Sequence, residues 1–379
     1  MNKASKKQIR ILHVVGGMNR GGAETWLMHV LRHIDRDRFR FDFLVHTDKP
    51  CAYDDEIRDL GSKIIPCLVP SQPWRYAVKF ARIMREYGPY DVVHSHVHHY
   101  SGFVLWLAKR SGVRTRIAHS HNENKPDDAN PNLYRRIYLS TMVCFLRFNA
   151  TIGLAASNKA AQALYGQDWK NDPRWHVLYC AVDLAPFFEE NDKMAIRKEL
   201  GIPENAFVVG HVGRFSEQKN HAFLLDVIRC MVERDPDVRC LLVGDGPLRQ
   251  DIENKIIRLG LTKHVIFTGV RADVPRLMLG AMDVFLLPSH YEGLGLVLIE
   301  AQAAGLPCVF SDVIPSEADV VPTLVKRVSL AQPPEKWAEM VVMTKDTISV
   351  PRAQAMGLIW RSPFEINQSI EKLTYLYSA

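Results

Sequence analysis

Residues 291–300 read Y-E-G-L-G-L-V-L-I-E and follow the apolar run D-V-F-L-L-P at residues 283–288. The run before Pro288 predicts a buried strand, and the apolar residues after Gly295 predict a helix. A strand that leads directly into a helix is typical of a parallel α/β sheet. The first amide groups of such a helix lack partners and favour an anion, commonly a phosphate, and the glycines let the backbone come close to it.

Two glutamates, Glu292 and Glu300, stand at the ends of this stretch, eight positions apart. A carboxylate beside an anion site suits a sugar hydroxyl or a ribose, because a charged acceptor binds hydroxyl donors well. The plainer alternative is a capped helix on the protein surface. The spacing therefore favours a nucleotide or sugar site, to be weighed with the other motifs.

Short strands alternate with helices along the chain in two series. Such alternation predicts parallel sheets with helices on both faces, and 379 residues exceed what one hydrophobic core usually supports. We therefore predict an α/β protein with two doubly wound, Rossmann-like domains whose strand ends face each other across a cleft. The domains are predicted at residues 1–183 and 205–362, with a charged linker at 184–204 and a final helix within 363–379.

The individual elements are predicted from the apolar patterns. Residues 329–362 show no clear pattern. Strands are predicted at residues 11–15, 41–46, 63–66, 91–96, 116–121, 207–212, 238–243, 265–268, 284–287 and 308–310, and helices at residues 23–32, 75–86, 105–109, 223–234, 249–259 and 363–377.

The composition, with 47% hydrophobic and 24% charged residues, is that of an ordinary globular protein. The apolar run at residues 11–15 is too short for a signal-peptide core. The longer stretch at residues 137–156 is interrupted by Arg147 and Asn149, so we expect a helix end and a strand there and no membrane span. Seven cysteines without a C-x-x-C pair fit neither a disulfide framework nor a zinc site, and we expect a cytoplasmic protein.

The charge is unevenly distributed along the chain. Residues 1–185 carry 27 Lys and Arg against 17 Asp and Glu, whereas the remainder carries 21 against 25. A basic first half favours an acidic partner such as a phospholipid or a phosphorylated lipid. Nucleic acid is not predicted as a partner, because the sequence contains no zinc-finger, RNA-recognition or helix-turn-helix pattern.

One predicted helix combines basic and apolar residues in a way that bears on the membrane. Its apolar members are Val78, Phe80, Ile83 and Met84, and its basic members are Arg75, Lys79, Arg82 and Arg85. This pattern predicts either a basic amphipathic helix, peripheral on the inner face of the cell membrane, or an ordinary solvated helix face.

Glycine-rich and basic turns follow several predicted strands. The first strand leads into G-G-M-N-R-G-G at residues 16–22, and V-G-R-F-S-E-Q-K-N at residues 212–220 places Arg214 five positions before Lys219. This pair offers a forked donor and a point cation for two phosphoryl groups, although an exposed ion-pair loop is the plainer reading. G-D-G-P at residues 244–247 and T-G-V-R-A-D-V-P at residues 268–275 follow later strands.

Six histidines cluster in two strand-end loops. Neutral imidazole is a common metal ligand, but no cysteine or carboxylate stands at ligand spacing beside these residues, so we do not predict a metal site. For His94, His98 and His99 a structural role is the plainer reading. The six are His94, His96, His98, His99, His119 and His121.

These motifs, in this order, resemble the retaining glycosyltransferases of family four (glycosyltransferase group 1), which have the GT-B fold. The similar stretches are the E-x7-E at residues 292–300, the G-R…K loop at 213–219, the G-x-G-P turn at 244–247 and the G-G-x-E at 21–24. The resemblance covers nearly the whole chain and is greatest to bacterial enzymes of exopolysaccharide and capsule biosynthesis. It implies that the final helix packs back on the first domain.

The resemblance assigns a role to each catalytic candidate. Arg214 and Lys219 would hold the donor diphosphate, which gains negative charge as the bond to the sugar breaks. Glu300 would bind the ribose and Glu292 the hydroxyls of the donor sugar. His121, or His119 as the second choice, would contact the sugar, and His121 would assist the departing oxygen or the acceptor. His96 and His119 are acceptor-side candidates. The full expected donor-binding set is Gly16, Gly17, Gly21, Gly22, Gly213, Arg214, Lys219, Gly244, Gly246, Val270, Glu292, Gly293, Leu294, Gly295, Leu296 and Glu300.

The implied activity is transfer of a sugar from a nucleotide-diphosphate sugar, expected to be a UDP-sugar, to a saccharide or polyprenyl-diphosphate-linked acceptor. Members of the family are thought to react on one face of the sugar, so neither a protein nucleophile, a cofactor nor a metal is expected. The D-x-D strings at residues 35–37 and 235–237 follow predicted helix ends and are expected in turns. Two alternatives remain, a nucleotide-sugar epimerase of the same fold and a non-catalytic subunit that senses the donor.

Overall fold

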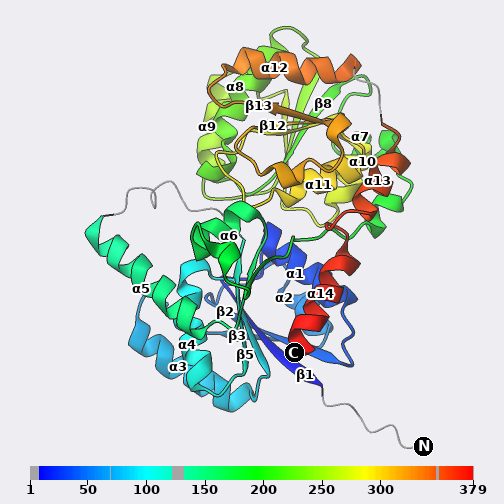
Figure 1. Cartoon of the computed structure of the whole chain (residues 1–379). Helices are drawn as coiled ribbons and strands as arrows, with labels where there is room; N and C mark the ends of the chain where they lie inside the picture. The colour runs from blue at the N-terminus through cyan, green and yellow to red at the C-terminus, as the bar shows by residue number, and fades with distance from the viewer. Residues whose placement is uncertain (1–7, 69, 122–131, 347–349, 379) are drawn as a thin grey trace, which may run out of the picture. The chain divides into compact units, whose positions relative to one another are not determined.

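The computed structural model describes residues 8–68, 70–121, 132–346 and 350–378, and its chain divides into two compact units. The first unit holds the chain up to Ala181 together with the segment from Ile366 onward, and the second holds Val182–Glu365. Each unit is a parallel sheet with helices on both faces (Figure 1). The predicted fold class is confirmed.

The first unit contains a seven-stranded parallel sheet in the order β3-β2-β1-β4-β5-β6-β7. Its first five strands lie within two residues of their predicted positions at each end. The two strands at one edge are short and were not given bounds from the sequence. The strands are β1 (Ile9–Val15), β2 (Phe39–Val45), β3 (Lys63–Pro66), β4 (Val92–Ser95), β5 (Thr115–Ser120), β6 (Ile152–Ala155) and β7 (Trp175–Val177).

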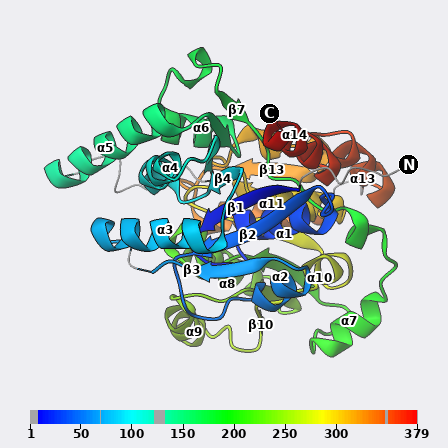
Figure 2. The ribbon, with the colours of Figure 1, turned by 90° about the horizontal axis from the view of Figure 1, so that it is seen from below.

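The helices of the first unit cover the two faces of this sheet (Figure 2). Alternate residues of β1 point to opposite faces, so Leu12 and Val14 join the core under α3 and α4, whereas His13 contacts Tyr377 of α14. The last helix therefore packs in the first unit, against α1 and β1. The helices are α1 (Gly22–His33), α2 (Asp54–Asp59), α3 (Pro73–Tyr87), α4 (Ser101–Arg110), α5 (Leu133–Asn149), α6 (Asn158–Tyr165) and α14 (Ile366–Ser378).

The second unit contains a six-stranded parallel sheet in the order β10-β9-β8-β11-β12-β13. The change of winding direction lies at β8 and β11, where the strand order reverses. Ligands of such sheets bind beside this point, at the carboxyl ends of the strands. The strands are β8 (Phe207–Val212), β9 (Val238–Val243), β10 (Val265–Gly269), β11 (Val284–Leu287), β12 (Cys308–Ser311) and β13 (Val325–Val328).

The helices of the second unit include two in the stretch without a clear sequence pattern. One of these, α12, begins after Pro333 and buries Trp337, Ala338 and Val341 against α8. The segment 184–204 contains α7, which packs on α10. The helices are α7 (Lys193–Glu199), α8 (His221–Val232), α9 (Arg249–Arg258), α10 (Val274–Gly280), α11 (Leu296–Ala303), α12 (Pro334–Val342) and α13 (Arg352–Trp360).

The stretch at residues 137–156 is a helix followed by a strand, as predicted, since α5 ends at Asn149 and β6 begins at Ile152. Across the described parts of the chain, no helix is long and apolar enough to span a membrane.

Candidate functional site

In the second unit, the loop after β8 carries both predicted diphosphate ligands, and they lie in different environments. Arg214 is exposed, and its guanidinium group makes no hydrogen bond or ion pair with the residues that the structure describes. The side chain of Lys219 is 15% exposed, and its Nζ lies 2.5 Å from Oε1 of Glu292, whose side chain is 7% exposed. The sequence expectation of a surface position therefore holds for Arg214, while Lys219 forms a largely buried ion pair.

Gln218 connects this loop to the loop before α11. Its Nε2 donates to the carbonyl of Tyr291 at 3.0 Å and to Oε2 of Glu292 at 3.3 Å, and its own carbonyl accepts from the amide of His290 at 2.8 Å. Gln218 and Lys219 together hold Glu292 in place, each through one of its two carboxylate oxygens. The sequence analysis missed Gln218, since an amide side chain in a loop has no pattern that marks its partner.

The loops after β8 and β9 lie in close contact, and this contact requires glycine at positions 244 and 246. Gly244 has a φ of +137°, and a Cβ there would lie 2.1 Å from the carbonyl oxygen of Gly213. A Cβ on Gly246 would lie 2.4 Å from the carbonyl oxygen of Phe215. Backbone hydrogen bonds from Gly213 to Val243 and from Phe215 to Asp245, each 3.0 Å, join the same loops. The glycines thus fix the course of the loop that presents Arg214.

The start of α11 has the geometry expected of an anion site. Gly295, with a φ of +83°, precedes the helix in the left-handed conformation, and Leu296 is its first residue. The first helical amides have no intrahelical partners. Gly293 and Leu294 lie buried in the approach to the helix.

Glu300 lies in the second turn of α11 and is partly buried. Its carboxylate forms no hydrogen bond or ion pair with the residues that the structure describes. Burial raises the pKa of Glu300 to about 7. A carboxyl group of this kind is ready to accept a hydrogen bond from a ligand hydroxyl.

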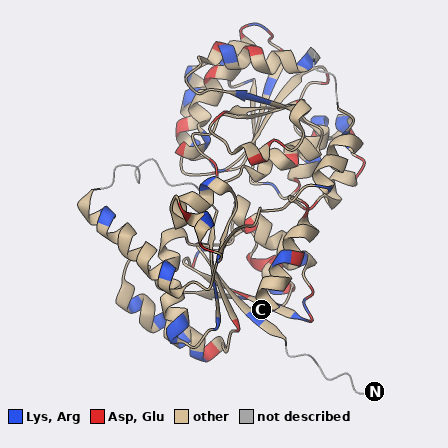
Figure 3. Ribbon diagram, viewed as in Figure 1, with Lys and Arg blue, Asp and Glu red and all other residues tan. Residues whose placement is uncertain are grey.

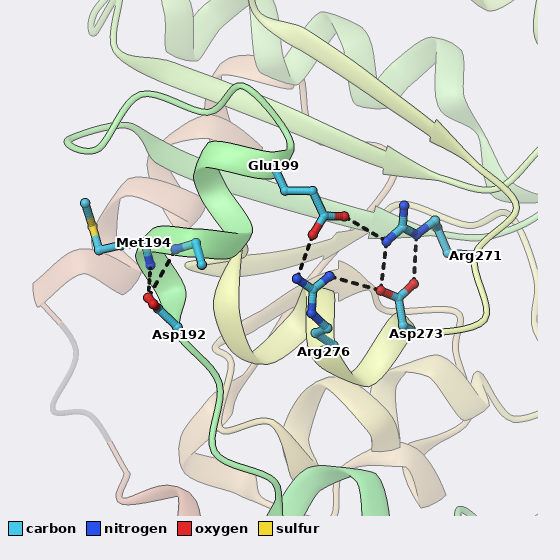
Figure 4. A network of polar contacts seen from close by, with 7 residues as sticks. Asp192, Met194, Glu199, Arg271, Asp273 and Arg276 are labelled. Atoms are coloured by element: carbon cyan, nitrogen blue, oxygen red, sulfur yellow. Dashed lines mark hydrogen bonds and ion pairs between the residues drawn. The ribbon is translucent and has the colours of Figure 1, made fainter.

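Val270 lies half-exposed, at 53%, on the loop after β10, which an ionic network holds beside α7 (Figure 4). Glu199 at the end of α7 accepts from Arg271 at 3.2 Å and from Arg276 at 2.6 Å, and both arginines also contact Asp273. Arg271 contributes most to lowering the pKa of Asp273 to about 2. The network braces the loop that carries Val270 of the expected donor-binding set.

In the first unit, the glycine-rich loop connects β1 to α1, which begins at Gly22. A Cβ on Gly17 would lie 2.9 Å from Cγ2 of Thr47, and a Cβ on Gly21 would lie 2.3 Å from Oε2 of Glu24. Gly16 and Gly22 have open space where a side chain would stand. The loop is therefore closely packed at two of its glycines and accessible at the other two.

Five histidines of the first unit form one cluster at the carboxyl ends of three adjacent strands. Nδ1 of His96 lies 2.8 Å from Nε2 of His121, and the rings of His119 and His121 stack with centroids 4.1 Å apart. Trp26 of α1 packs edge-on against His119. The members are His13 of β1, His94 of β4, His96, His119 of β5 and His121.

Burial keeps the imidazoles of this cluster neutral. Desolvation lowers the pKa of His13 and that of His121 to about 3, and it lowers the pKa of His96 and His119 well below the ordinary value. Cys180 lies beside the cluster, with its Sγ 3.5 Å from Nδ1 of His121. The sequence search for ligand neighbours missed this cysteine, because it stands 59 positions away along the chain.

The structure thus brings the predicted residues together in two groups, one in each unit. Arg214, Lys219, Glu292 and Glu300 belong to adjacent loops and the first helix turns of the second unit, and His96, His119 and His121 belong to the cluster of the first unit. The D-x-D strings lie in turns, as predicted. Asp35 accepts from the amide of Asp37 at 3.1 Å, and Asp235 accepts from that of Asp237 at 3.0 Å.

Comparisons with known proteins give consistent matches over both units. Residues 20–186 match the model of Glycosyltransferase Family 4, and residues 192–342 match that of Glycosyl transferases group 1. The sequence is 38% identical to the putative glycosyltransferase EpsF of Bacillus subtilis (strain 168), over 100% of this chain and 98% of the relative. It is 28% identical to the capsular polysaccharide biosynthesis glycosyltransferase CapH of Staphylococcus aureus, over 97% and 98% of the two chains.

Among solved structures, the chain is similar to HepE of Anabaena in complex with UDP and glucose. The TM-score is 0.80 at 21% sequence identity, over 98% of this chain and 100% of the other. At this identity the likeness establishes a common fold.

Proposed function

The chain belongs to the glycosyltransferases of group 1 and family 4, and from this premise we propose that it is a retaining enzyme of exopolysaccharide or capsule assembly. It takes a sugar from a UDP-sugar and transfers it to a saccharide or polyprenyl-diphosphate-linked acceptor. EpsF is named as a putative glycosyltransferase and CapH as an enzyme of capsular polysaccharide biosynthesis, and the HepE complex contains UDP and glucose. These names support the proposed acceptor class and donor base.

The observation that carries the proposal is the arrangement of charges around the start of α11. The guanidinium of Arg214 has no partner among the described residues. Lys219 is held beside Glu292 with donors left over, since an ammonium group has three. Two phosphoryl groups can pair with these cations while the Glu292 carboxylate accepts sugar hydroxyls. Positive and negative groups placed side by side suit a ligand that is an anion at one end and a polyol at the other.

We assign the chemistry of transfer to the same residues. As the glycosidic bond breaks, the leaving diphosphate gains negative charge, which Arg214 and Lys219 stabilise more strongly than the bound donor. Glu300 accepts from the ribose hydroxyls. His121 contacts the transferred sugar, and the leaving phosphate takes the proton of the acceptor on the same face of the sugar. We propose that this transfer requires no metal ion.

Membrane contact is a second part of the proposal, and α5 supports it better than α3. In α3, Phe80, Ile83 and Met84 are buried in the core, so the basic face of that helix is an ordinary solvated face. The exposed large apolar side chains of α3 are Trp74 and Val78. In α5, four large apolar side chains are 58–84% exposed: Leu133, Tyr134, Ile137 and Phe148.

The charge of α5 also fits an anionic surface. The helix contains three arginines and no acidic residue. Figure 3 shows blue segments along it. Exposed apolar side chains beside cations suit the headgroup region of a bilayer that contains anionic lipid. A polyprenyl-linked acceptor resides in such a bilayer, so α5 is our proposed membrane contact.

The experiment that tests the proposed reaction presents the protein with a panel of nucleotide-diphosphate sugars. We expect one UDP-sugar to raise the melting temperature of the protein, and we expect slow release of UDP from it. The Arg214→Ala variant should show neither effect. With an added acceptor, the anomeric configuration of the first product should match that of the donor, and transfer should persist in excess chelator. An inverted product or complete, metal-reversible loss of transfer would contradict the proposal.

The same experiment separates the alternatives. Conversion of the donor to an epimer without release of nucleotide would establish an epimerase. Donor binding without release, with every acceptor tried, would favour a subunit that senses the donor.

Membrane contact is tested by sedimentation with vesicles. We expect the protein to sediment with phosphatidylglycerol vesicles and less with neutral ones, and the double variant Tyr134→Ser, Ile137→Ser to lose most of this binding. Ile257→Ser is the matched control, because Ile257 is 68% exposed in the second unit. Equal binding of the double variant and the control would exclude α5 as the contact.

A further inference from the structure

The histidine cluster of the first unit is arranged as more than a packed core. Among the residues that the structure describes, the buried nitrogens Nε2 of His13 and Nε2 of His119 have no hydrogen-bond partner. A buried polar atom without a partner is costly, and natural proteins pair almost all of them. These two buried nitrogens are therefore candidates for contact with a ligand.

Each of three rings uses one nitrogen in a contact with a residue outside the group of three. Nε2 of His96 is bonded to Nδ1 of His13 at 3.1 Å, Nδ1 of His119 to Nε2 of His94 at 3.2 Å, and Nδ1 of His121 contacts Sγ of Cys180 at 3.5 Å. The remaining nitrogens are Nδ1 of His96, Nε2 of His119 and Nε2 of His121. These three rings each offer a nitrogen within 4.8 Å of the others.

We propose that His96, His119 and His121 bind a transition-metal dication, with Zn²⁺ as the foremost candidate, through these three nitrogens. Imidazole nitrogens bind Zn²⁺ at about 2.0–2.1 Å, in tetrahedral sites that leave a fourth position for water when the protein supplies three ligands. The outer nitrogens, bonded to His13, His94 and Cys180, then form the supporting contacts that ligating histidines usually have.

Metal binding changes one bond of the cluster. In the empty cluster, the nitrogens of His96 and His121 share a single proton across 2.8 Å. Because both rings are neutral, that proton moves to the outer nitrogen of the ring that carries it, which then donates to Nδ1 of His13 or to Sγ of Cys180. The ion takes the place of the proton, and the two nitrogens separate slightly to reach tetrahedral spacing. No hydrogen bond to a residue outside the three ligands is broken, and the unpartnered Nε2 of His119 gains a partner.

A second group, His13, His94 and His96, also has ligand nitrogens within 4.8 Å. It is less suitable, because His94 could bind an ion only by losing its bond to the hydroxyl of Tyr377 at 2.8 Å or its bond to His119, both outside that group. In the proposed group, the bond that an ion displaces joins two of the ligands. The second group is also fully enclosed at His13 and His94, whereas His96 and His121 are partly exposed and give an ion a route of entry.

The site does not depend on the proposed transfer reaction. It does share His121 with it, so a bound ion would withdraw this ring from the sugar. We therefore expect zinc to inhibit transfer and a chelator to restore it, in agreement with a reaction that requires no metal.

The test is equilibrium dialysis of the full-length protein, without a polyhistidine tag, against Zn²⁺ alone. We expect one zinc ion per chain, and a loss of affinity of more than about 100-fold in both His119→Asn and His96→Asn, which exceeds the effect usual for a supporting contact. His221→Asn is the matched control, a buried histidine of the second unit, and should bind as the unchanged protein does.

Circular dichroism of each variant establishes that it is folded, and Co²⁺ provides a second measurement. A tetrahedral site with nitrogen ligands should produce visible Co²⁺ absorption that zinc abolishes. Absence of a stoichiometric ion in the unchanged protein, or equal affinity in His119→Asn and the control, would overturn the proposal. Loss of binding in His13→Asn with binding retained in His119→Asn would also overturn it, because the ligands would then be the other group.

Discussion

At the scale of single residues, Arg214 and Lys219 share one loop but lie in different environments. The Arg214 guanidinium is exposed and has no partner among the described residues, so its charge is available to a ligand. Lys219 neutralises the largely buried Glu292. A charge that is buried without its partner is far more costly than a missing surface charge.

We predict that Arg214→Ala lowers transfer by about 100-fold or more but changes the free energy of unfolding by less than about 0.5 kcal/mol. Lys219→Ala should lower transfer as strongly and also cost about 3 kcal/mol of stability, because Glu292 loses its partner. Steady-state kinetics and urea unfolding measure the two effects. Arg258→Ala, an exposed arginine of α9, is the control. Wild-type turnover in Arg214→Ala would contradict the diphosphate assignment.

Glu300 gives donor binding a dependence on pH. Its folded-state pKa of about 7 lies above its ordinary value, so the carboxyl is mostly neutral at pH 6 and mostly ionised at pH 8. A ribose hydroxyl donates more strongly to the carboxylate. We predict that affinity for the donor rises from pH 6 to pH 8, measured by calorimetry, and that Glu300→Gln flattens this rise.

The same shift affects stability. In the unfolded chain Glu300 is ionised above its ordinary pKa, whereas in the folded protein ionisation is delayed to about pH 7. The contribution of Glu300 to stability is therefore present at low pH and lost as pH rises through 7. We expect Glu300→Gln to gain stability relative to the unchanged protein between pH 5 and pH 8. A constant difference over that range would contradict the raised pKa.

At the scale of elements, the strands follow their apolar runs closely and the helices less so. The predicted strands at residues 63–66, 207–212, 238–243 and 284–287 have the bounds of β3, β8, β9 and β11. Three of these, β8, β9 and β11, are central strands, which are buried on both faces of a parallel sheet, so their apolar runs are continuous and easily located. Helix α12 escaped prediction because the burial of Trp337 depends on α8, which lies about a hundred residues earlier.

The contact between the loops after β8 and β9 has a testable consequence for the stability of the second unit. We predict that Gly244→Ala destabilises the second unit by at least about 3 kcal/mol, since it combines an unfavourable φ with a clash against the carbonyl of Gly213. Gly260→Ala is the matched control, with a φ of +70° and nothing within 4 Å, and should cost about 1 kcal/mol. Urea unfolding measures the loss of stability in each variant. Equal losses would show that the two loops move apart without an energetic penalty.

At the scale of the whole molecule, the last helix of the chain belongs to the first unit. Nε1 of Trp26 in α1 donates to Oγ of Ser369 at 3.1 Å, and the hydroxyl of Tyr377 contacts Nδ1 of His94 at 2.8 Å. Residues more than 280 positions apart thus share one core. The first unit is complete only when the end of the chain has docked.

We predict that Tyr377→Phe lowers the stability of the first unit by about 1–3 kcal/mol, because Nδ1 of buried His94 loses its hydroxyl partner. Tyr375→Phe is the control on the same helix, as Tyr375 is 75% exposed, and should have almost no effect. Thermal unfolding followed by the fluorescence of the buried Trp26 measures the difference. Identical melting of the two variants would show that the bond to His94 contributes nothing.

The sequence by itself determined the two-sheet α/β fold, the positions of most strands along the chain and the placement of the glycine turns, and its motifs identified Arg214, Lys219, Glu292 and Glu300 as a candidate donor site by resemblance to a family. These features are local, because apolar runs and turn residues act over a few positions. Only the tertiary structure decided that Lys219 is buried against Glu292, that Gln218 holds both loops, and that Cys180 and Tyr377 adjoin the histidines. Such contacts join segments distant in sequence, and no local pattern records which partner a buried polar atom will meet.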